Sequence, residues 1–168
     1  MELFTAYYES PVGVLKLTAR DSMLTGILFS DEKTVSSSGR GVVKSLPPVL
    51  KECIQQLDDY FSGSRTVFEL DMEQPGTSFQ QKVWAELMNI PFGKTISYLE
   101  LARRIGNEKS IRAVGTANGS NNICIMVPCH RVIGSNGKLV GYGGGLWRKQ
   151  WLLEHEQKFS PLKAGMLF

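Results

Sequence analysis

Apolar and polar residues alternate along residues 3–29, as expected for β-strands that bury only one face. The alternation is interrupted near residues 10, 21 and 30, where serine, proline and aspartate cluster. These breaks predict an antiparallel meander. We place its strands at 3–9, 12–19 and 23–29. A further short strand is predicted over 67–70, and a flexible loop over the glycine- and serine-rich residues 36–41.

After the loop, the apolar spacing changes to the three- to four-residue period of amphipathic helices. A proline pair opens the first helical pattern, and capping-box sequences that begin at Thr77 and Ser97 open two later ones. Cys53 and Trp84 fall on apolar helix faces and are expected in the core. The patterns predict helices over 48–61, 78–88, 98–105, 111–118 and 146–156.

Residues 71–76 combine acidic side chains with a Pro-Gly pair and separate the strand-rich part of the chain from the helical part. We therefore predict two domains, 1–76 and 77–168, and an α+β fold class. The first domain is an antiparallel sheet with one helix, and the second is helical. Within the second domain, two short helices joined by a tight turn at 107–110 indicate a helix-turn-helix.

Charge is divided unevenly between these two predicted domains. Residues 1–76 carry 7 Lys/Arg and 11 Asp/Glu, whereas residues 77–168 carry 12 and 5. A basic surface commonly matches the phosphate backbone of nucleic acids. Ordinary solvated Lys and Arg side chains explain the same count, so charge alone leaves both explanations open.

Hydrophobic residues make up 42% of the chain and charged residues 21%, which is typical of a soluble globular protein. No apolar run approaches the ~20 residues of a membrane span, and the N-terminus lacks the features of a signal peptide. The cysteines, Cys53, Cys124 and Cys129, form no Cys-x-x-Cys pair. We therefore expect no disulfide framework, no metal site and a location in the reducing cytoplasm.

The stretch 123–133, Ile-Cys-Ile-Met-Val-Pro-Cys-His-Arg-Val-Ile, carries the strongest candidate chemistry. Its apolar start predicts a buried strand that ends at Pro128, because proline cannot donate a ladder hydrogen bond. Cys129 would then stand at the end of a rigid element, where a reactive thiol is held in place. In an extended chain, His130 would point to the other side. A cysteine that only fills the core explains the same position.

The predicted helix 111–118 is the candidate recognition helix. It is rich in small residues, among them Gly115, Thr116 and Ala117, and Arg112 is its only long charged side chain. Such a helix can approach a partner closely in a confined groove. The glycine-rich residues 134–145 also allow close backbone approach to a ligand. Many helical hairpins bind no DNA, so this pattern alone leaves DNA binding open.

Several spaced motifs together resemble the O6-alkylguanine-DNA alkyltransferase family. They are Arg-Ala-Val-Gly at 112–115, Asn-Gly-Ser-Asn at 118–121, Val-Pro-Cys-His-Arg-Val at 127–132, Tyr-Gly-Gly-Gly-Leu at 142–146 and Trp-Leu-Leu-Glu-His-Glu at 151–156. The similarity spans roughly residues 77–156. The predicted meander also resembles the N-terminal ribonuclease-H-like domain of that family.

This resemblance implies a DNA repair protein. An alkyl group, typically methyl, would move from guanine O6 in double-stranded DNA to Cys129, irreversibly and once per molecule, without a cofactor. O4-methylthymine is a second candidate substrate. The damaged base would be flipped out of the duplex into a pocket. The protein is expected to act as a cytoplasmic monomer with no membrane partner.

The resemblance also implies the residues of the site. His130 would activate the Cys129 thiol through a water molecule, Glu156 would orient His130, and Arg112 would fill the space that the flipped base leaves. Asn121 and Tyr98 complete the catalytic set. The other implied contacts are Val132, Leu139, Tyr142 and Gly143 for the substrate, and Thr116, Ala117, Asn118 and Arg131 for DNA.

Two other functions explain part of the pattern. A non-enzymatic helix-turn-helix regulator would account for the basic half but would leave Cys129, His130 and Glu156 without a role. A cysteine hydrolase would use the thiol, but it would turn over through a thioester and would not depend on DNA. In the favoured interpretation, Cys124 is expected to be dispensable for transfer.

Overall fold

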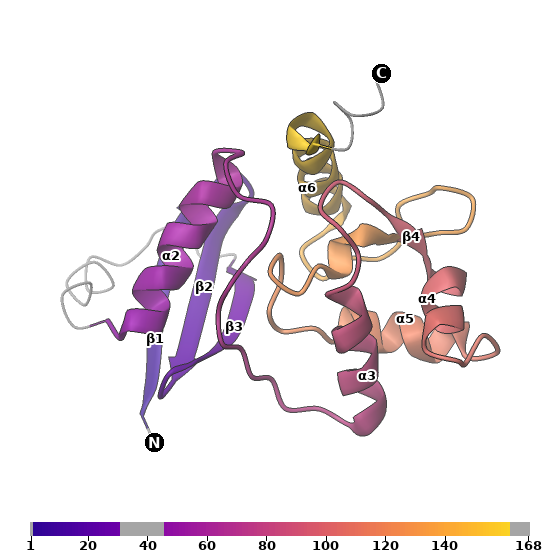
Figure 1. The fold of residues 1–168 in the computed structure, drawn as a ribbon, viewed down its shortest axis with the longest axis horizontal. Helices are drawn as coiled ribbons and strands as arrows, with labels where there is room; N and C mark the ends of the chain where they lie inside the picture. Colours follow the sequence, from indigo (N-terminus) through magenta and orange to yellow (C-terminus); the bar gives the residue numbers. More distant parts are fainter. Residues whose placement is uncertain (1, 31–45, 162–168) are drawn as a thin grey trace. The chain divides into compact units, whose positions relative to one another are not determined.

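The computed structural model describes residues 2–30 and 46–161. The chain divides into two compact units, Met1–Gln74 and Pro75–Phe168 (Figure 1). The loop predicted over 36–41 lies outside the described residues. None of the helices within the described ranges is long and apolar enough to cross a membrane.

The first unit is an antiparallel sheet whose strands β1 (Leu3–Ser10), β2 (Gly13–Arg20) and β3 (Met23–Ser30) lie side by side in chain order. The predicted meander is confirmed, and each strand ends one residue later than predicted. Ser10 closes the first turn, because its hydroxyl donates to the Gly13 carbonyl at 2.6 Å and accepts from the Val12 N–H at 3.1 Å.

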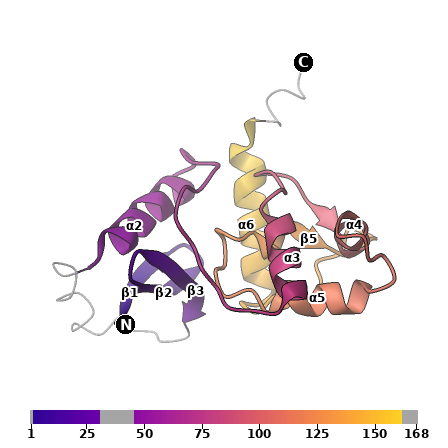
Figure 2. The same cartoon turned by 60° about the horizontal axis from the view of Figure 1, so that its bottom comes forward.

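Helix α2 (Pro48–Phe61) packs across one face of this sheet (Figures 1 and 2). Its inward residues Leu50, Cys53 and Leu57 are fully buried, as are Leu15 and Ile27 of the sheet. Cys53 is therefore a core residue, as predicted. Its thiol is surrounded by apolar side chains, and burial raises the pKa of this thiol to about 12.

The prediction of a strand over 67–70 is wrong. The structure describes these residues, and none of them is in a strand; a single bridge nearby joins Leu24 to Met72. The segment is held instead by Gln56 of α2. The Gln56 amide donates to the Glu69 carbonyl and its oxygen accepts from the Glu69 N–H, both at 2.9 Å. One side chain thus takes the place of a partner strand.

The second unit is mainly helical in its described part. Its elements are α3 (Ser78–Leu87), β4 (Ile96–Ser97), α4 (Tyr98–Arg104), α5 (Ile111–Gly119), the 3-10 turn η2 (Cys129–Arg131), β5 (Val132–Ile133) and α6 (Leu146–Phe159). The four predicted helices of this half are confirmed. Helix α6 runs three residues past its predicted end at 156, and the predicted helix-turn-helix is formed by α4 and α5.

Side-chain caps fix the starts of α3 and α4. Thr77 accepts from the Gln80 N–H at 3.1 Å, and Gln80 accepts from the Thr77 N–H at 2.9 Å, so this capping box is complete. At α4, Ser97 accepts from the Glu100 N–H at 3.0 Å, while the Glu100 carboxylate binds Arg104 at 3.1 Å.

The short parallel ladder between β4 and β5 aligns Ile96 with Val132 and Ser97 with Ile133. Turn η2 leads directly into β5, and α4 follows β4 directly. The ladder therefore brings Tyr98, the first residue of α4, into the region of the turn that carries Cys129. Helices α3 and α5 pack beside each other in the same unit (Figure 2).

Candidate active site

Turn η2 carries the candidate nucleophile, Cys129. Its N–H donates to the Val127 carbonyl at 2.8 Å, and its carbonyl accepts from the Asn118 side chain at 3.3 Å. The expectation of an extended chain through Cys129 and His130 is therefore wrong. A 3-10 turn has three residues per revolution, so these two neighbouring side chains still point in different directions.

The apolar residues 123–127 are buried, as predicted, but they form a turn and not a strand. The Val127 N–H donates to the Ile123 carbonyl at 2.9 Å. Ile125 has a φ of 74°, in the left-handed region that β-branched residues rarely adopt. Strain of this kind persists only where the surrounding structure imposes it, and it is frequent beside functional sites.

Asn121 ties the two ends of this turn together. Its Nδ2 donates to the Val127 carbonyl at 2.8 Å, and its Oδ1 accepts from the Ile123 N–H at 3.0 Å. The Asn121 side chain also lowers the pKa of the Cys129 thiol. This buried amide therefore links the backbone of the turn to the candidate nucleophile.

Glu156, from α6, lies at the centre of a buried cluster behind the turn. Its Oε2 is 2.7 Å from His130 Nε2. Arg131 donates to the same carboxylate through Nε at 2.8 Å and through Nη2 at 3.0 Å. The Gly93 N–H adds a donor at 3.2 Å. His130 and Glu156 have no exposed surface, so this cluster is shielded from bulk water.

Arg131 is not placed for the DNA contact that the sequence predicts. Its remaining Nη1 donates to the Ile90 carbonyl at 2.7 Å, and its guanidinium lies 5.8 Å from the centre of the Phe92 ring. The side chain is only 7% exposed. Arg131 is instead the counter-ion that a buried carboxylate such as Glu156 requires.

The protonation states of this cluster follow from burial and charge. Burial lowers the pKa of His130 more than Glu156 raises it, so the imidazole is neutral near pH 7. Burial raises the pKa of Glu156. The charge of His130 when the imidazole is protonated, the hydrogen bonds from His130 and Arg131, and the charge of Arg131 outweigh this effect, so the pKa of Glu156 lies well below its ordinary value.

A neutral imidazole beside a carboxylate carries its proton on the nitrogen that faces the carboxylate. In His130 this nitrogen is Nε2, which leaves Nδ1 as an acceptor. Nδ1 is buried and makes no hydrogen bond with any residue that the structure describes. The site therefore contains a base whose lone pair is available, as a nucleophile–base–orienter set requires.

The Cys129 thiol is more acidic than an ordinary thiol although it is 5% exposed. A hydrogen bond from Cys124 lowers its pKa most; burial opposes this effect, and the Asn121 side chain and the charge of Lys149 lower the pKa further. The thiolate is the nucleophilic form of cysteine. Cys124, which is predicted to be dispensable for transfer, thus acts on the ionisation of the candidate nucleophile.

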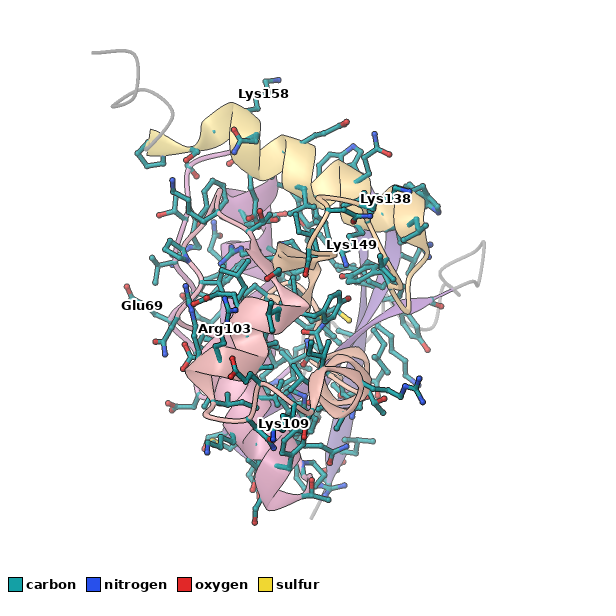
Figure 3. The ribbon with its side chains drawn as sticks, turned by 90° about the vertical axis from the view of Figure 1, so that its right-hand side faces the viewer. Glu69, Arg103, Lys109, Lys138, Lys149 and Lys158 are labelled. Atoms are coloured by element: carbon teal, nitrogen blue, oxygen red, sulfur yellow. The ribbon has the colours of Figure 1, made fainter. Side chains whose placement is uncertain are left out.

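Lys149 is a second residue of the site for which the sequence predicts no role. Its side chain is fully buried, and its Nζ donates to the carbonyls of Val140 and Gly141 at 3.0 and 3.4 Å. Nζ also lies 5.7 Å from the centre of the Tyr98 ring. Figure 3 shows Lys149 on the inner side of α6, whereas Lys158 points away from the same helix. Lys149 therefore connects α6 to the glycine-rich loop.

Burial lowers the pKa of Lys149 to about 8, and the negative charge of Cys129 acts in the opposite direction. Near pH 7 the ammonium is therefore mostly charged and stabilises the thiolate. A signal for this role is present in the sequence. Lys149 lies three residues before the buried Leu152, on the inward face of α6, where lysine is rare unless it is paired.

Replacing Lys149 with methionine is expected to raise the pKa of Cys129, because the variant keeps the aliphatic stem but loses a positive charge that acts on the sulfur. The rate of iodoacetamide alkylation, measured against pH, reports the thiolate fraction. Its profile should move to higher pH. Lys158→Met, on the exposed side of the same helix, should leave the profile unchanged, and identical profiles for both variants would exclude an electrostatic role for Lys149.

The Val140 carbonyl also accepts a hydrogen bond from the Tyr98 hydroxyl, at 3.1 Å. Burial, followed by the negative charge of Cys129, raises the pKa of Tyr98. The hydroxyl therefore stays protonated and can serve as a donor. A second aromatic residue, Tyr142, lowers the pKa of Cys124. Two of the predicted site tyrosines thus lie close enough to the two thiols to interact with them.

The other predicted substrate contacts differ in exposure. Val132 is fully buried in β5, Leu139 and Tyr142 are half-buried, and Gly143 is exposed. A Cβ atom added at Gly143 would meet no heavy atom within 4 Å. The glycine therefore leaves open space at this part of the loop, and its role toward a substrate stays a prediction.

Helix α5 exposes one face at Arg112, Ala113 and Thr116. Together with the start of α3, this face borders a hollow of about 620 Å³. The small side chains predicted for a recognition helix are thus present on an accessible surface. Arg112 and Thr116 remain available for the partner that the sequence predicts.

Ala117 and Asn118, for which DNA contacts are predicted, have buried side chains. The Ala117 carbonyl accepts from the Trp84 Nε1–H at 2.9 Å, so Trp84 is a core residue, as predicted. Ala117 also borders the hollow beside α3 and α5. The Asn118 side chain donates to the Cys129 carbonyl and so joins the recognition helix to the site.

No group of His, Cys, Asp and Glu side chains that could hold a metal ion occurs within residues 2–30 and 46–161.

Two protein-family models match the chain. The model for the 6-O-methylguanine DNA methyltransferase ribonuclease-like domain matches residues 3–74. The model for the 6-O-methylguanine DNA methyltransferase DNA binding domain matches residues 78–158. The two matches follow one another along the chain and together include every residue of the site described above.

Known relatives show the same similarity over nearly the whole chain. The methylated-DNA–protein-cysteine methyltransferase of Mycolicibacterium paratuberculosis is 47% identical over 153 residues, which are 91% of this chain and 92% of the relative. The structure of the Mycobacterium tuberculosis O6-methylguanine methyltransferase is similar with a TM-score of 0.83 and 40% identity, over 99% of this chain and all of that one. The structure of OGT from the same organism in complex with DNA gives 0.81 and 42%, over 94% of each chain.

Proposed function

Because the chain belongs to the 6-O-methylguanine DNA methyltransferase family, we propose that it repairs DNA by transferring an alkyl group, typically methyl, from guanine O6 to its own Cys129. The observation that carries this proposal is a buried thiol with a lowered pKa next to a hydrogen-bonded imidazole and carboxylate. The pKa values of Cys53 and Cys124 are raised, which makes these thiols weaker candidates.

We infer that a water molecule links the Cys129 sulfur to His130 Nδ1 and carries the thiol proton to this nitrogen. The inference rests on the buried Nδ1 atom, which has no hydrogen-bond partner among the described residues. Glu156 stabilises the imidazolium that results, because its carboxylate lies 2.7 Å from Nε2. Arg131 keeps this carboxylate ionised throughout.

In the transfer step the Cys129 thiolate attacks the alkyl carbon, a carbon–sulfur bond forms, and the carbon–O6 bond breaks. The electron pair of the broken bond passes to the guanine, which needs hydrogen-bond donors. We propose Tyr98, whose hydroxyl stays protonated, as the side-chain donor. The backbone N–H groups of Tyr142 and Gly143 are the donors that we assign to O6, since glycine supplies no side-chain hydroxyl.

The product is a thioether, which has no activated carbonyl for water to attack. Each molecule is therefore expected to act once. This property separates the proposed activity from that of a cysteine hydrolase, in which a thioester is hydrolysed and the thiol is regenerated. No cofactor enters the proposed reaction, and O4-methylthymine remains a second candidate substrate for the same site.

We propose that residues 77–168 form the part that binds DNA and that α5 faces the duplex through Arg112 and Thr116, which are exposed. A base inside a duplex has to be flipped out before its O6 atom can reach a buried sulfur. We propose that Arg112 enters the stack in its place. The three free thiols of the chain are consistent with action in the cytoplasm.

Arg112→Ala should slow repair of O6-methylguanine in a duplex more than reaction with the free base, because only the duplex reaction includes flipping. Each ~1.4 kcal/mol of lost stabilisation slows the duplex reaction about tenfold. Single-turnover rates on both substrates measure the difference. Arg103→Ala removes an exposed arginine that is paired with Glu108 and serves as the control. Equal slowing on duplex and free base would contradict the role in flipping.

The proposed function is tested by the intact mass of the protein after incubation with a duplex that contains O6-methylguanine. We expect the gain of one methyl group, located on Cys129 by peptide mapping, in a yield equal to the amount of protein. No gain of mass would favour a non-enzymatic regulator. Repeated turnover without a stable adduct would favour a hydrolase. A parallel incubation with O4-methylthymine duplex tests the second substrate.

A further inference from the structure

Cys124 and Cys129 form a pair of free thiols in the same short segment of chain. They are 8% and 5% exposed, and both belong to the turn in which the Val127 N–H donates to the Ile123 carbonyl at 2.9 Å and the Cys129 N–H donates to the Val127 carbonyl at 2.8 Å. Each thiol also acts on the pKa of the other, so the two groups are close. The proposed alkyl transfer places a group on only one of these sulfurs. It therefore does not explain why a second thiol lies beside the first.

A cysteine that is held as a thiolate is also the form that peroxides oxidise, and the first product is a sulfenic acid. Without a neighbouring thiol, oxidation continues to sulfinic and sulfonic acids, which are in general irreversible. With a thiol in contact, the sulfenic acid condenses to a disulfide, which a dithiol reductant reverses. The closed turn that carries both Cys124 and Cys129 provides the second arrangement.

We propose that Cys124 is the resolving cysteine of Cys129, so that oxidation by hydrogen peroxide closes a reversible Cys124–Cys129 disulfide in place of irreversible oxidation. The disulfide itself requires only the two thiols. Its consequence, a stored and recoverable alkyl acceptor, rests on the function proposed above.

Atoms and electrons balance in two steps. The Cys129 thiolate attacks one peroxide oxygen, the O–O bond breaks, and the hydroxide that leaves takes up a proton to become water. The Cys129 sulfur is oxidised and the peroxide is reduced. The Cys124 sulfur then attacks the Cys129 sulfur, the S–S bond forms, and the S–O bond breaks. The departing hydroxide takes the Cys124 proton and leaves as a second water.

Cys53 provides a matched comparison within the chain. It is also a free and buried thiol, but it lies in the core beneath α2, and burial raises its pKa to about 12. A thiol of this kind is unreactive toward peroxide. Burial alone therefore does not produce the proposed chemistry, and Cys53→Ala is the control variant.

The test treats the full-length protein with hydrogen peroxide, blocks the remaining thiols with iodoacetamide, and measures tryptic peptides by mass. The peptide 113–131, which contains both cysteines, should lose two hydrogen atoms and remain unalkylated. Cys53→Ala should give the same result. Cys124→Ser and Cys124→Ala should show no such loss, and Cys129 should gain two or three oxygen atoms that dithiothreitol does not remove.

Methyl uptake from O6-methylguanine duplex provides the second readout. Oxidised wild-type protein should take up no methyl group and should recover uptake after dithiothreitol, whereas the oxidised Cys124 variants should not recover. Oxygen gain at Cys129 in wild-type protein, or a disulfide that contains Cys53, would overturn the proposal. A correct disulfide in a protein that never takes up methyl, even when reduced, would instead refute the proposed function and leave the dithiol chemistry standing.

Discussion

Replacing Cys129 with alanine is expected to abolish alkyl transfer completely and to leave DNA binding in place. The variant removes the attacking sulfur, while α5, with its exposed Arg112 and Thr116, is unchanged. The Asn118 side chain still meets the backbone carbonyl at position 129, since the hydrogen bond does not involve the thiol. Intact mass measures transfer, and fluorescence anisotropy with a labelled O6-methylguanine duplex measures binding.

Cys53→Ala is the matched control for this variant. It removes an equally buried thiol from the core beneath α2 and should retain stoichiometric methyl uptake. If Cys129→Ala loses DNA binding together with transfer, the thiol is primarily a structural group. Methyl uptake at another cysteine in the Cys129→Ala protein would contradict the assignment of the acceptor.

Glu156→Gln should produce the largest loss of stability among single changes in the site. The amide keeps the shape of the side chain, but it leaves the Arg131 guanidinium buried without a counter-ion. Removal of one partner from a buried ion pair costs about 3–5 kcal/mol. Urea unfolding followed by circular dichroism measures the free energy of unfolding. Glu154→Gln, at an exposed position of the same helix, should change it by no more than about 0.5 kcal/mol.

The change in the free energy of unfolding with pH provides a second test of the role of Glu156. The pKa of Glu156 is lower in the folded protein than its ordinary value of about 4.3. As the pH falls below that ordinary value, the unfolded state binds the proton first, and the stabilisation by the carboxylate is lost progressively. Wild-type protein should therefore lose more stability on acidification than Glu156→Gln. Parallel acid curves for the two proteins would contradict the burial of an ionised carboxylate.

Helices and strands with clear local signals could be predicted from the sequence. The capping box at Thr77 and the serine cap at Ser97 start their helices where the residue types indicate. The alternation over 3–29 correctly predicted the sheet, and the spaced motifs correctly indicated the family. The helix caps and the alternation depend on neighbours within a few residues, which is why the sequence alone was sufficient to predict these elements.

The errors concern segments whose backbone is held by side chains. An apolar run such as 123–127 has the same composition in a buried strand and in a buried turn. Here the Asn121 amide binds the backbone at both ends of the run and stabilises the turn. The prediction of a strand over 67–70 is wrong for a similar reason, because Gln56 of α2 binds the backbone of that segment. Residue types alone do not reveal such contacts.

Charged residues of the site were the hardest to assign. Arg131 follows the reactive pair in sequence and resembles a surface contact, yet it turns inward to Glu156. Lys149 was overlooked because lysine is generally a surface residue, although its position in the α6 pattern is an inward one. The effect of Cys124 on the pKa of Cys129 depends on the turn that carries both residues, which the sequence did not predict.

The bond from Lys149 to the glycine-rich loop has a practical consequence for protein engineering. Residues 134–145 resemble a segment that could be shortened or exchanged freely, since they contain no helix or strand. Yet the Val140 carbonyl receives both an ammonium and a phenol from the interior. A graft that moves this carbonyl would leave the buried Lys149 ammonium without an acceptor, so the path of this segment is constrained although it contains no helix or strand.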